Sequence, residues 1–387
     1  MTESVVVLGS GYAGAGAIQS LEARTGRGVD ITWISDVDHH LVLHEVHRCI
    51  RDPSVRHKVT VPVEEIASPS TTFRQGTVVD VEVDDRLVHL ASGGSVGYDY
   101  LLVALGTETA FFGIDGLEEH AYTLKGLEDA LDIHDAVVDA TEGASPADPA
   151  RVVVGGAGLS GIQVAGEVAE YSREHGAPID VHLVEGLDHI LPESDPQLQG
   201  ALRQRLEDRD VDIHTGEFVG AVDGDRVYVG DDATIDYDVL VWTGGITGRE
   251  AVRDAEIAKD ERNHRIYANE TFETDDERVF AIGDCALIDQ PGGPTAPPTA
   301  QAAWQAAEVI GENVARRMRG QPLVGWTHED KGTVVSVGES AVAYEVMYSP
   351  IALIGGTPAK LLKKAIAARW LADIAGIRRA IDAWPDM

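Results

Sequence analysis

The pattern of hydrophobic positions predicts two copies of one α/β unit. An apolar run at 4–8 is typical of a buried parallel strand, and a helical repeat of apolar positions and a second strand, VDITWIS, follow it. The same order returns with a strand at 152–154, a helix and the strand IDVHLVE. Each unit also has a matching later strand, at 98–107 and at 237–245. The chain therefore contains an internal repeat.

The turn after the first strand reads Gly9-Ser-Gly11-Tyr-Ala-Gly14, between a strand and a helix. The first glycine permits the tight turn, the second lets a pyrophosphate approach the backbone, and the third lets helix and strand pack closely. The helix N-terminus adds unpaired N–H groups and the positive end of its dipole. Asp36, after the second strand, is the predicted partner of ribose hydroxyls; the alternative is a solvent-facing turn residue.

A second motif of the same spacing, Gly156-Ala-Gly158-Leu-Ser-Gly161, opens the second unit. Its next strand ends in Glu185, a carboxylate placed to accept both ribose hydroxyls of an adenosine. Arginine is absent from the following EGLDHI, so a 2′-phosphate has no partner there. The second site is therefore predicted to prefer NADH over NADPH. Two motifs, each with its own acidic partner, indicate two dinucleotide sites.

The late segment RVFAIGDCAL, at 278–287, ends a strand in a Gly-Asp pair. Because the second unit is already complete, we interpret this segment as a return of the chain to the first domain. The predicted fold class is α/β, with two Rossmann-like dinucleotide-binding domains. The predicted limits are 1–115 with 265–330 for the first domain, 116–264 for the second and 331–387 for a small C-terminal region.

Composition changes the picture in one respect, which is charge. Lys and Arg number 31 against 65 Asp and Glu, a formal net charge of -34. Such a surface repels nucleic acid and stays soluble in concentrated salt, so we interpret it as a halophilic adaptation to a salt-filled cytoplasm. The two cysteines, Cys49 and Cys285, form no C-x-x-C, which argues against disulfide chemistry. The N-terminus resembles no signal peptide, so a cytoplasmic location is expected.

Together these features resemble the flavoproteins with two dinucleotide-binding domains, within the pyridine nucleotide-disulfide oxidoreductase-like superfamily. The branch most resembled is the type II NADH:quinone oxidoreductases, on the stretches LHEV at 43–46, VVVGGAGLSG, VWTGGITG, PPTAQAAWQAAE and GTVVSVG. The resemblance implies FAD in the first site and NADH as substrate in the second. The residues that it assigns, besides those of the two motifs, are Gly106, Gly283, Asp284 and Ala300 for FAD, and Gly244 for NADH.

The activity that the resemblance implies is hydride transfer from NADH to FAD, and then electron transfer to a membrane quinone without proton pumping. Menaquinone is the expected quinone, and a respiratory chain the expected setting. Gln301 and Gln305 are expected to line the flavin–quinone pocket, although both could instead cap loops or pack at the domain interface. Where the family usually has a glutamate, this chain has Gln163, so Glu167 one helical turn later is a candidate substitute for proton delivery.

Other functions stay open at this stage. An NADH-dependent reductase of a small electron carrier, of the ferredoxin or rubredoxin kind, needs no membrane contact. A flavin-binding redox sensor would turn over slowly and act by changing partners. The sulfide:quinone reductases are disfavoured, because they need more cysteines near the flavin than this chain offers. The histidines His40, His44 and His47 stand at helical spacing, but the segment resembles the flavin-facing stretch of the family, so no metal is predicted.

The C-terminal segment is basic and apolar in this acidic chain. The apolar positions repeat every three or four residues and predict one helical face: Leu362, Ile366, Trp370, Ile374, Ile377, Ile381 and Trp384. Lys363 interrupts the pattern, and Gly376 is expected to divide the element into two helices. The prediction is an interfacial helix that docks the protein on the cytoplasmic face of the membrane. The alternative is that this face packs on the protein itself or across a homodimer.

Overall fold

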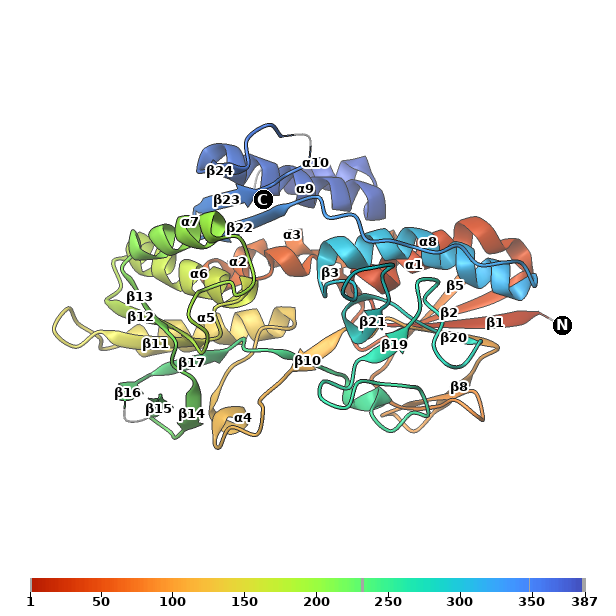
Figure 1. The fold of residues 1–387 in the computed structure, drawn as a ribbon, viewed down its shortest axis with the longest axis horizontal. Coiled ribbons are helices and arrows are strands. Elements are labelled where there is room, and N and C mark those ends of the chain that lie inside the picture. Colours follow the sequence, from red (N-terminus) through yellow and green to blue (C-terminus); the bar gives the residue numbers. More distant parts are fainter. Residues whose placement is uncertain (1, 231–232, 348, 385–387) are drawn as a thin grey trace.

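The structure, a computed structural model, describes residues 2–230, 233–347 and 349–384. The first repeat forms a parallel five-stranded sheet, in the right half of Figure 1. Its strands, in pairing order, are β20 (Val279–Ala281), β9 (Tyr100–Val103), β1 (Glu3–Leu8), β2 (Val29–Ser35) and β5 (Thr71–Gln75). Because β20 pairs with β9, the predicted return of the chain at 278–287 is confirmed.

The second repeat forms a parallel four-stranded sheet, in the left half of Figure 1. Its strands, in pairing order, are β13 (Val211–Thr215), β12 (Ile179–Glu185), β11 (Ala150–Gly155) and β17 (Val239–Trp242). Most of their residues are buried, as the apolar runs of parallel strands require. The predicted α/β class with two such units is therefore confirmed.

Two helices, α1 (Tyr12–Thr25) and α8 (Ala300–Met318), lie side by side on the upper face of the first sheet (Figure 1). A Cβ added to Gly16 would lie 2.7 Å from Ala307 Cβ, so the lack of a side chain lets the two helices approach closely. Helix α8 begins at Ala300. The hydroxyl of Thr299 caps it by accepting from the backbone of the first turn.

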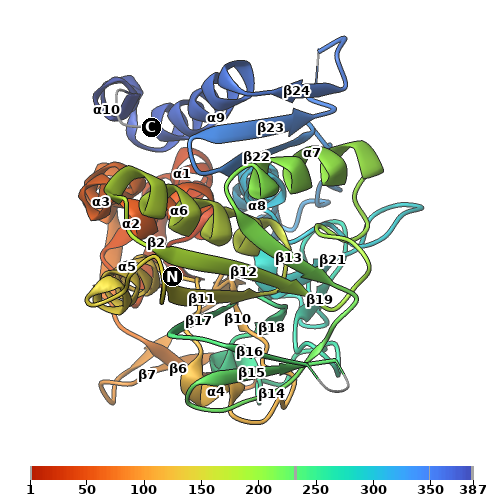
Figure 2. The same ribbon diagram turned by 90° about the vertical axis from the view of Figure 1, so that its left-hand side faces the viewer.

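Helices α6 (Leu159–His175) and α7 (Pro196–Glu207) cover the upper face of the second sheet in Figures 1 and 2. Small antiparallel sheets lie below both main sheets. Also helical are α2 (Arg48–Arg51), α3 (Arg56–Val59), α4 (Leu117–His120) and α5 (Leu127–Thr141). The small sheets are β6 (Val78–Glu82) with β7 (Leu87–Leu90) and β8 (Ser95–Gly97), and β14 (Val219–Val222) with β15 (Arg226–Val229) and β16 (Ala233–Asp236).

Paired strands also join the two halves and support the loops. Strand β10 (Thr107–Thr109) pairs antiparallel with β18 (Ile246–Gly248) and connects the two halves. Further pairs are β3 (His39–Leu41) with β4 (Thr60–Pro62), and β19 (Ile266–Ala268) with β21 (Ala286–Ile288).

The C-terminal region lies over both halves, at the top of Figures 1 and 2. It consists of β22 (Thr333–Val337), β23 (Ser340–Tyr344), β24 (Leu353–Gly355), α9 (Thr357–Ala375) and α10 (Ile377–Ala383). The expected division at Gly376 is confirmed, since this residue has φ of 90° and separates α9 from α10. No helix among the described residues is long and apolar enough to cross a membrane.

The predicted single apolar face of the tail is wrong. Trp370 and Ile374 are buried against the body of the protein, whereas Ile377 and Ile381 are 65% and 63% exposed. The reason is that α9 packs on the protein through a face that also contains Lys363, and the turn at Gly376 redirects α10. The packing alternative therefore holds for the face of α9 that contains Trp370 and Ile374. The exposed large apolar residues of the tail are Leu361 and Ile366 on α9, Ile377 and Ile381 on α10, and Trp384 after it.

Candidate active site

The first glycine turn is closed on one side and open on the other. Gly9 has φ of +99°, and a Cβ there would overlap the carbonyl of Ala104, while a Cβ on Gly14 would overlap the carbonyl of Gly9. A Cβ on Gly11 would meet nothing within 4 Å. The turn therefore presents an uncovered backbone at the start of α1, where phosphate oxygens can approach the N–H groups.

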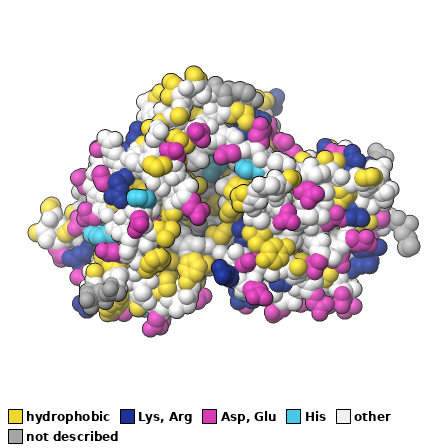
Figure 3. Space-filling view, in the orientation of Figure 1, with side chains coloured by type: hydrophobic (Ala, Val, Ile, Leu, Met, Phe, Trp, Pro, Cys, Tyr) yellow, Lys and Arg dark blue, Asp and Glu magenta, His cyan; other side chains and the backbone are white. Residues whose placement is uncertain are grey.

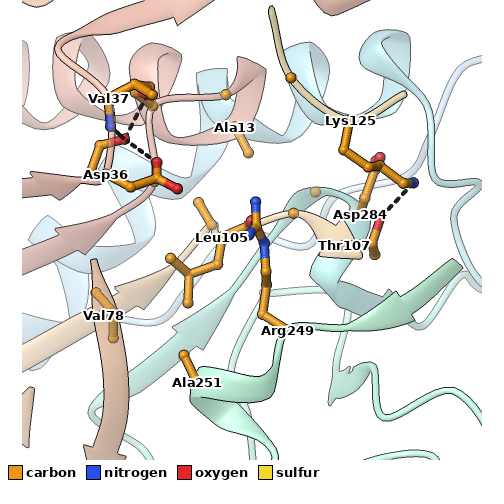
Figure 4. Close-up of a pocket in the computed structure, with 18 of the residues that line it drawn as sticks. Ala13, Asp36, Val37, Val78, Leu105, Thr107, Lys125, Arg249, Ala251 and Asp284 are labelled. Atoms are coloured by element: carbon orange, nitrogen blue, oxygen red, sulfur yellow. Dashed lines mark hydrogen bonds between the residues drawn. The ribbon is translucent and has the colours of Figure 1, made fainter. Parts of the chain in front are cut away.

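A cavity of about 880 Å³ extends from this turn. Asp36, Val78 and Val37 lie at one end of the view in Figure 4, and Asp284 and Lys125 lie at the other. The lining also includes Gly106, Gly283 and Ala300, so the structure brings together the residues assigned to the first site. The hydroxyl of Ser35 donates to Asp36 Oδ1 at 3.3 Å, and Asp36 lines the cavity.

The charged end of the cavity contains two residues that the sequence reasoning missed. Lys125 Nζ lies 3.5 Å from the hydroxyl of Thr107, and Arg249 Nε donates to the carbonyl of Leu105 at 3.2 Å. Burial raises the pKa of Asp284, although the charge of Lys125 acts in the opposite direction. Burial also lowers the pKa of Lys125. The end of the cavity thus holds a cation beside a carboxylate, a combination suited to a polyhydroxylated or anionic ligand.

The second glycine turn has the same construction. Gly156 has φ of +89°, a Cβ on Gly161 would overlap its carbonyl, and a Cβ on Gly158 would meet nothing within 4 Å. A Cβ on Gly156 would lie 2.7 Å from Gly244, so the turn and the end of β17 are in close contact. The open glycine again faces the start of a helix, α6.

Glu185 is fixed at the end of β12 by two backbone groups. Its Oε2 accepts from the N–H of Ala157 at 2.8 Å, and its Oε1 accepts from the N–H of Leu187 at 3.0 Å. Each carboxylate oxygen has a further lone pair that can accept from a ribose hydroxyl. The predicted carboxylate is therefore held beside the second turn.

A buried polar network lies where α6, α2 and α9 meet. Lys363 Nζ on α9 lies 3.3 Å from Glu45 Oε1 and donates to the hydroxyl of Ser336 at 2.7 Å. His47 Nε2 lies 2.9 Å from the same hydroxyl and 3.8 Å from Glu167 Oε1. Polar groups from distant parts of the sequence thus share one interior region.

Gln163 and Glu167 both enter this network from α6. With its amide oriented to satisfy both ends, Gln163 accepts from Lys363 Nζ at 3.1 Å and donates to Leu159 O at 3.3 Å. Glu167 Oε2 lies 3.0 Å from Nε of Arg51. The structure therefore brings these two predicted residues together, with Lys363 beside them.

The network sets several pKa values. Burial raises the pKa of Glu167 to about 7, although Arg51 acts in the opposite direction. Burial would also raise the pKa of Glu45, but Lys363, His44 and Arg48 together outweigh burial, and the pKa is lowered. Burial lowers the pKa of His44 to about 4 and that of His47 well below its usual value. The histidines are therefore neutral near pH 7, and Glu167 is poised to exchange a proton.

Gln301 and Gln305 both bond to the backbone of the segment before β22, and their expected place beside a quinone stays a prediction. Gln301 accepts from the N–H of Lys331 at 2.8 Å and donates to Gly332 O at 3.2 Å. Gln305 makes the same pair of bonds with the backbone of Glu329, at 3.0 and 2.8 Å. Both amides hold the segment before β22 against α8, which agrees with the loop-capping alternative, and neither residue lines the cavity at the first turn.

The histidine and cysteine side chains have contacts within the protein. His40 Nδ1 lies 2.8 Å from Ser10 O, and its Nε2 accepts from Trp370 Nε1 at 2.7 Å. The hydroxyl of Tyr12 lies 2.5 Å from Nδ1 of His44. Cys49 and Cys285 are buried and unpaired, and burial raises their pKa values to about 12 and about 11. Neither thiol is suited to disulfide exchange.

Residues 3–307 match the family described as pyridine nucleotide-disulphide oxidoreductase. The chain belongs to this family. Among curated proteins it is similar to a type II NADH:quinone oxidoreductase of Staphylococcus aureus (strain NCTC 8325 / PS 47), at 26% identity over 97% of this chain and 96% of the relative.

Solved structures share the fold of this family member. NDH2 from Plasmodium falciparum in complex with NADH has a TM-score of 0.87 at 17% identity, over 100% of this chain and 98% of that one. The sulfide:quinone oxidoreductase of Aquifex aeolicus has a TM-score of 0.79 at 19% identity, over 97% and 92%.

The residues of the first cavity fit the FAD that the family resemblance implies. The open backbone at Gly11 suits a pyrophosphate, Asp36 suits the adenosine ribose, and Asp284 suits the hydroxyls of a ribityl chain. FAD supplies hydride and electron transfer when it is bound, and the protein supplies its position and electrostatic surroundings.

The buried network was mostly missed from the sequence. In the sequence, Lys363 is recognisable only as an interruption of an amphipathic helix, and Arg51 belongs to no recognisable motif. The available signal was the Lys363 position itself, because a charge at a position with core spacing requires a buried partner.

Proposed function

We propose that this protein is an FAD-dependent NADH dehydrogenase that passes electrons to a membrane quinone without pumping protons. The observation that carries the proposal is the pair of open glycine turns, each near a carboxylate at the end of the next strand, in a chain similar over nearly its whole length to a type II NADH:quinone oxidoreductase. Residues 1–115 and 265–330 would form the FAD domain, and 116–264 the NADH domain.

In this proposal NADH binds at the second turn. The N–H groups at the start of α6 receive its pyrophosphate at Gly158, and Glu185 accepts from the adenosine ribose. A 2′-phosphate would bring negative charge next to that carboxylate. The protein would therefore select NADH.

Glu167 is the proposed proton donor for quinone reduction. Gln163 orients the neighbouring groups by its hydrogen bonds, because an amide does not release a proton at neutral pH. Glu167 lies 3.8 Å from His47, which in turn lies 3.3 Å from Lys363. These contacts gather Glu167, His47 and Lys363 in one buried polar cluster, from which Glu167 would supply the proton. Gln301 and Gln305 would act indirectly, by holding the segment that leads to β22.

The exposed residues of the C-terminal helices support peripheral attachment to the cytoplasmic face of a membrane. Leu361, Ile377, Ile381 and Trp384 are 53%, 65%, 63% and 40% exposed. Cations such as Arg378 accompany them. Tryptophan and cations are suited to the headgroup region, and apolar side chains to the acyl boundary. A quinone dissolved in the bilayer, for example menaquinone of a respiratory chain, would then be within reach; a homodimer is the competing use of this surface.

The purified protein tests the proposal directly. The expected results are a flavin absorption spectrum, bleaching on addition of NADH, and steady-state NADH oxidation once a short-chain quinone is added. Reduction by one equivalent of NADH without turnover would favour a redox sensor. Turnover with a small electron-carrier protein but not with quinone would favour the carrier-reductase alternative, and a protein without flavin would overturn the proposal.

A further inference from the structure

Two aromatic side chains are exceptionally exposed. Phe112 and Phe218 are 71% and 66% exposed, more than any other large apolar side chain in the described part of the chain. Apolar side chains gather in Figure 3 on the lower part of the left half, the region of β14, β17 and α4 in Figure 1. Exposed phenylalanine gains from being covered by a ligand or partner, so the surroundings of each ring decide whether it has such a role.

Phe218 lies against a glycine at the end of β12. A Cβ added to Gly186 would overlap the Phe218 ring, so only the missing side chain lets the ring occupy this place. The loop that carries Phe218 is also tied to this strand, since the N–H of Glu217 donates to the carbonyl of Glu185 at 3.3 Å. The ring is therefore held beside the residue that follows Glu185.

An exposed apolar residue and a fixed carboxylate stand at the same strand end. Leu187 is 49% exposed, and its N–H donates to Glu185 Oε1 at 3.0 Å. The other carboxylate oxygen faces the glycine turn through the N–H of Ala157 at 2.8 Å. The carboxylate thus stands between the turn, which suits phosphates, and an apolar surface that consists of Phe218 and Leu187.

That order matches the order of groups in an adenosine diphosphate: phosphate, ribose, base. The ribose hydroxyls belong at Glu185 and the phosphates at the turn, so the base falls on the remaining side. A purine has two apolar faces, and an aromatic ring is a suitable platform for it. We propose that Phe218 stacks on the adenine of NADH and thereby determines the affinity for the adenosine half of the substrate.

This inference rests on the proposed use of NADH, so its test separates the two. The ligand is ADP-ribose, which contains the adenine, ribose and phosphates but undergoes no oxidation. Isothermal titration of the FAD-loaded protein should show Phe218→Ala weakening ADP-ribose binding about 10- to 100-fold, the range expected for loss of one stacked base. Phe218→Trp should bind as tightly as the wild type.

A matched control is Tyr228→Ala, because Tyr228 is a 39% exposed aromatic residue on the adjacent strand β15. It should leave ADP-ribose binding unchanged. Kinetics give a second readout: Phe218→Ala should raise KM for NADH with little change in kcat, and should leave oxidation of reduced nicotinamide mononucleotide, which lacks adenosine, unaffected.

Three outcomes would overturn the inference. Unchanged ADP-ribose binding by Phe218→Ala places the adenine elsewhere. Equal losses for NADH and for reduced nicotinamide mononucleotide mean that the ring supports the domain rather than the base. A change from dimer to monomer in Phe218→Ala, with binding intact, assigns the ring to an interface between copies. A wild-type protein that binds neither NADH nor ADP-ribose would instead overturn the proposed function.

Discussion

The Nζ atom of Lys363 lies 3.3 Å from Oε1 of Glu45, and both side chains are buried. The first residue belongs to α9, near the C-terminus, and the second to the short helical turn at 43–45, near the start of the chain. A buried ion pair of this kind connects the C-terminal region to the loop beside Tyr12, which lines the first cavity.

Lys363→Met is expected to destabilise the protein by about 3–5 kcal/mol, because it leaves the Glu45 carboxylate buried without its cation. Guanidinium unfolding measures the difference. Lys360→Met is the matched control: Lys360 lies on the same helix, but its partner Glu339 is exposed, so a change of at most about 1 kcal/mol is expected. The double variant Glu45→Gln/Lys363→Met should recover part of the loss, and a loss equal to the sum of the two single variants would mean that the pair is not coupled.

Glu167→Gln is expected to change how stability depends on pH. The pKa of Glu167 is raised to about 7 in the folded protein, so the protonated carboxyl favours folding at low pH, and this contribution disappears as the pH rises through 7. Relative to Glu167→Gln, the wild type should therefore lose about 3 kcal/mol between pH 5 and pH 8. Unfolding of both proteins across this range measures the difference.

The same variant tests the proposed proton donor. Quinone reduction by the wild type should fall as the pH rises through 7, since the donor is then ionised, and Glu167→Gln should be slow at every pH. Flavin reduction by NADH should be nearly unaffected. Glu174→Gln serves as the control, because Glu174 contacts the same Arg51 but is 46% exposed. An unchanged pH profile in Glu167→Gln would assign the proton to another group.

Glu185→Arg is expected to move the preference from NADH toward NADPH, because a guanidinium attracts the 2′-phosphate that the carboxylate repels. The readout is the ratio of kcat/KM values for the two nucleotides. Glu185 also fixes two loop N–H groups, so the substitution should lower kcat/KM for both nucleotides. The ratio of the two kcat/KM values isolates the change in preference. Glu185→Gln is the control for this loss. Wild-type protein that already uses NADPH as well as NADH would contradict the assignment.

Ile377→Ser/Ile381→Ser is expected to weaken binding to anionic liposomes about 10-fold or more, since each exposed isoleucine would lose its burial in lipid. The free energy of unfolding should stay within about 1 kcal/mol, because both side chains are exposed. Point variants are used because deletion of the tail would uncover the core around Trp370. Ile351→Ser, at a 59% exposed position outside these helices, is the control. Unchanged liposome binding with a loss of dimer would assign the surface to self-association.

Much of the fold and both dinucleotide turns followed from the sequence, because they depend on local physics. Gly9 and Gly156 occupy backbone conformations that other residues rarely adopt, and the apolar runs of β1 and β11 mark buried parallel strands. Glu185 could also be identified from the sequence, because the acidic residue of such a unit follows the glycine turn at a characteristic spacing along the chain. The return of β20 to the first sheet was also predictable, because a complete second unit left it no other place.

Only the tertiary structure determined the contacts between segments that are far apart in the chain. Nothing local distinguishes a lysine that lies in lipid headgroups from Lys363, which is buried against Glu45. The face by which α9 packs, the place of Gln301 on the backbone before β22, and the approach of Phe218 to Gly186 are of the same kind. Each depends on which surfaces meet when separate elements bury their apolar area together, and the spacing of residues along one helix or strand does not contain that information.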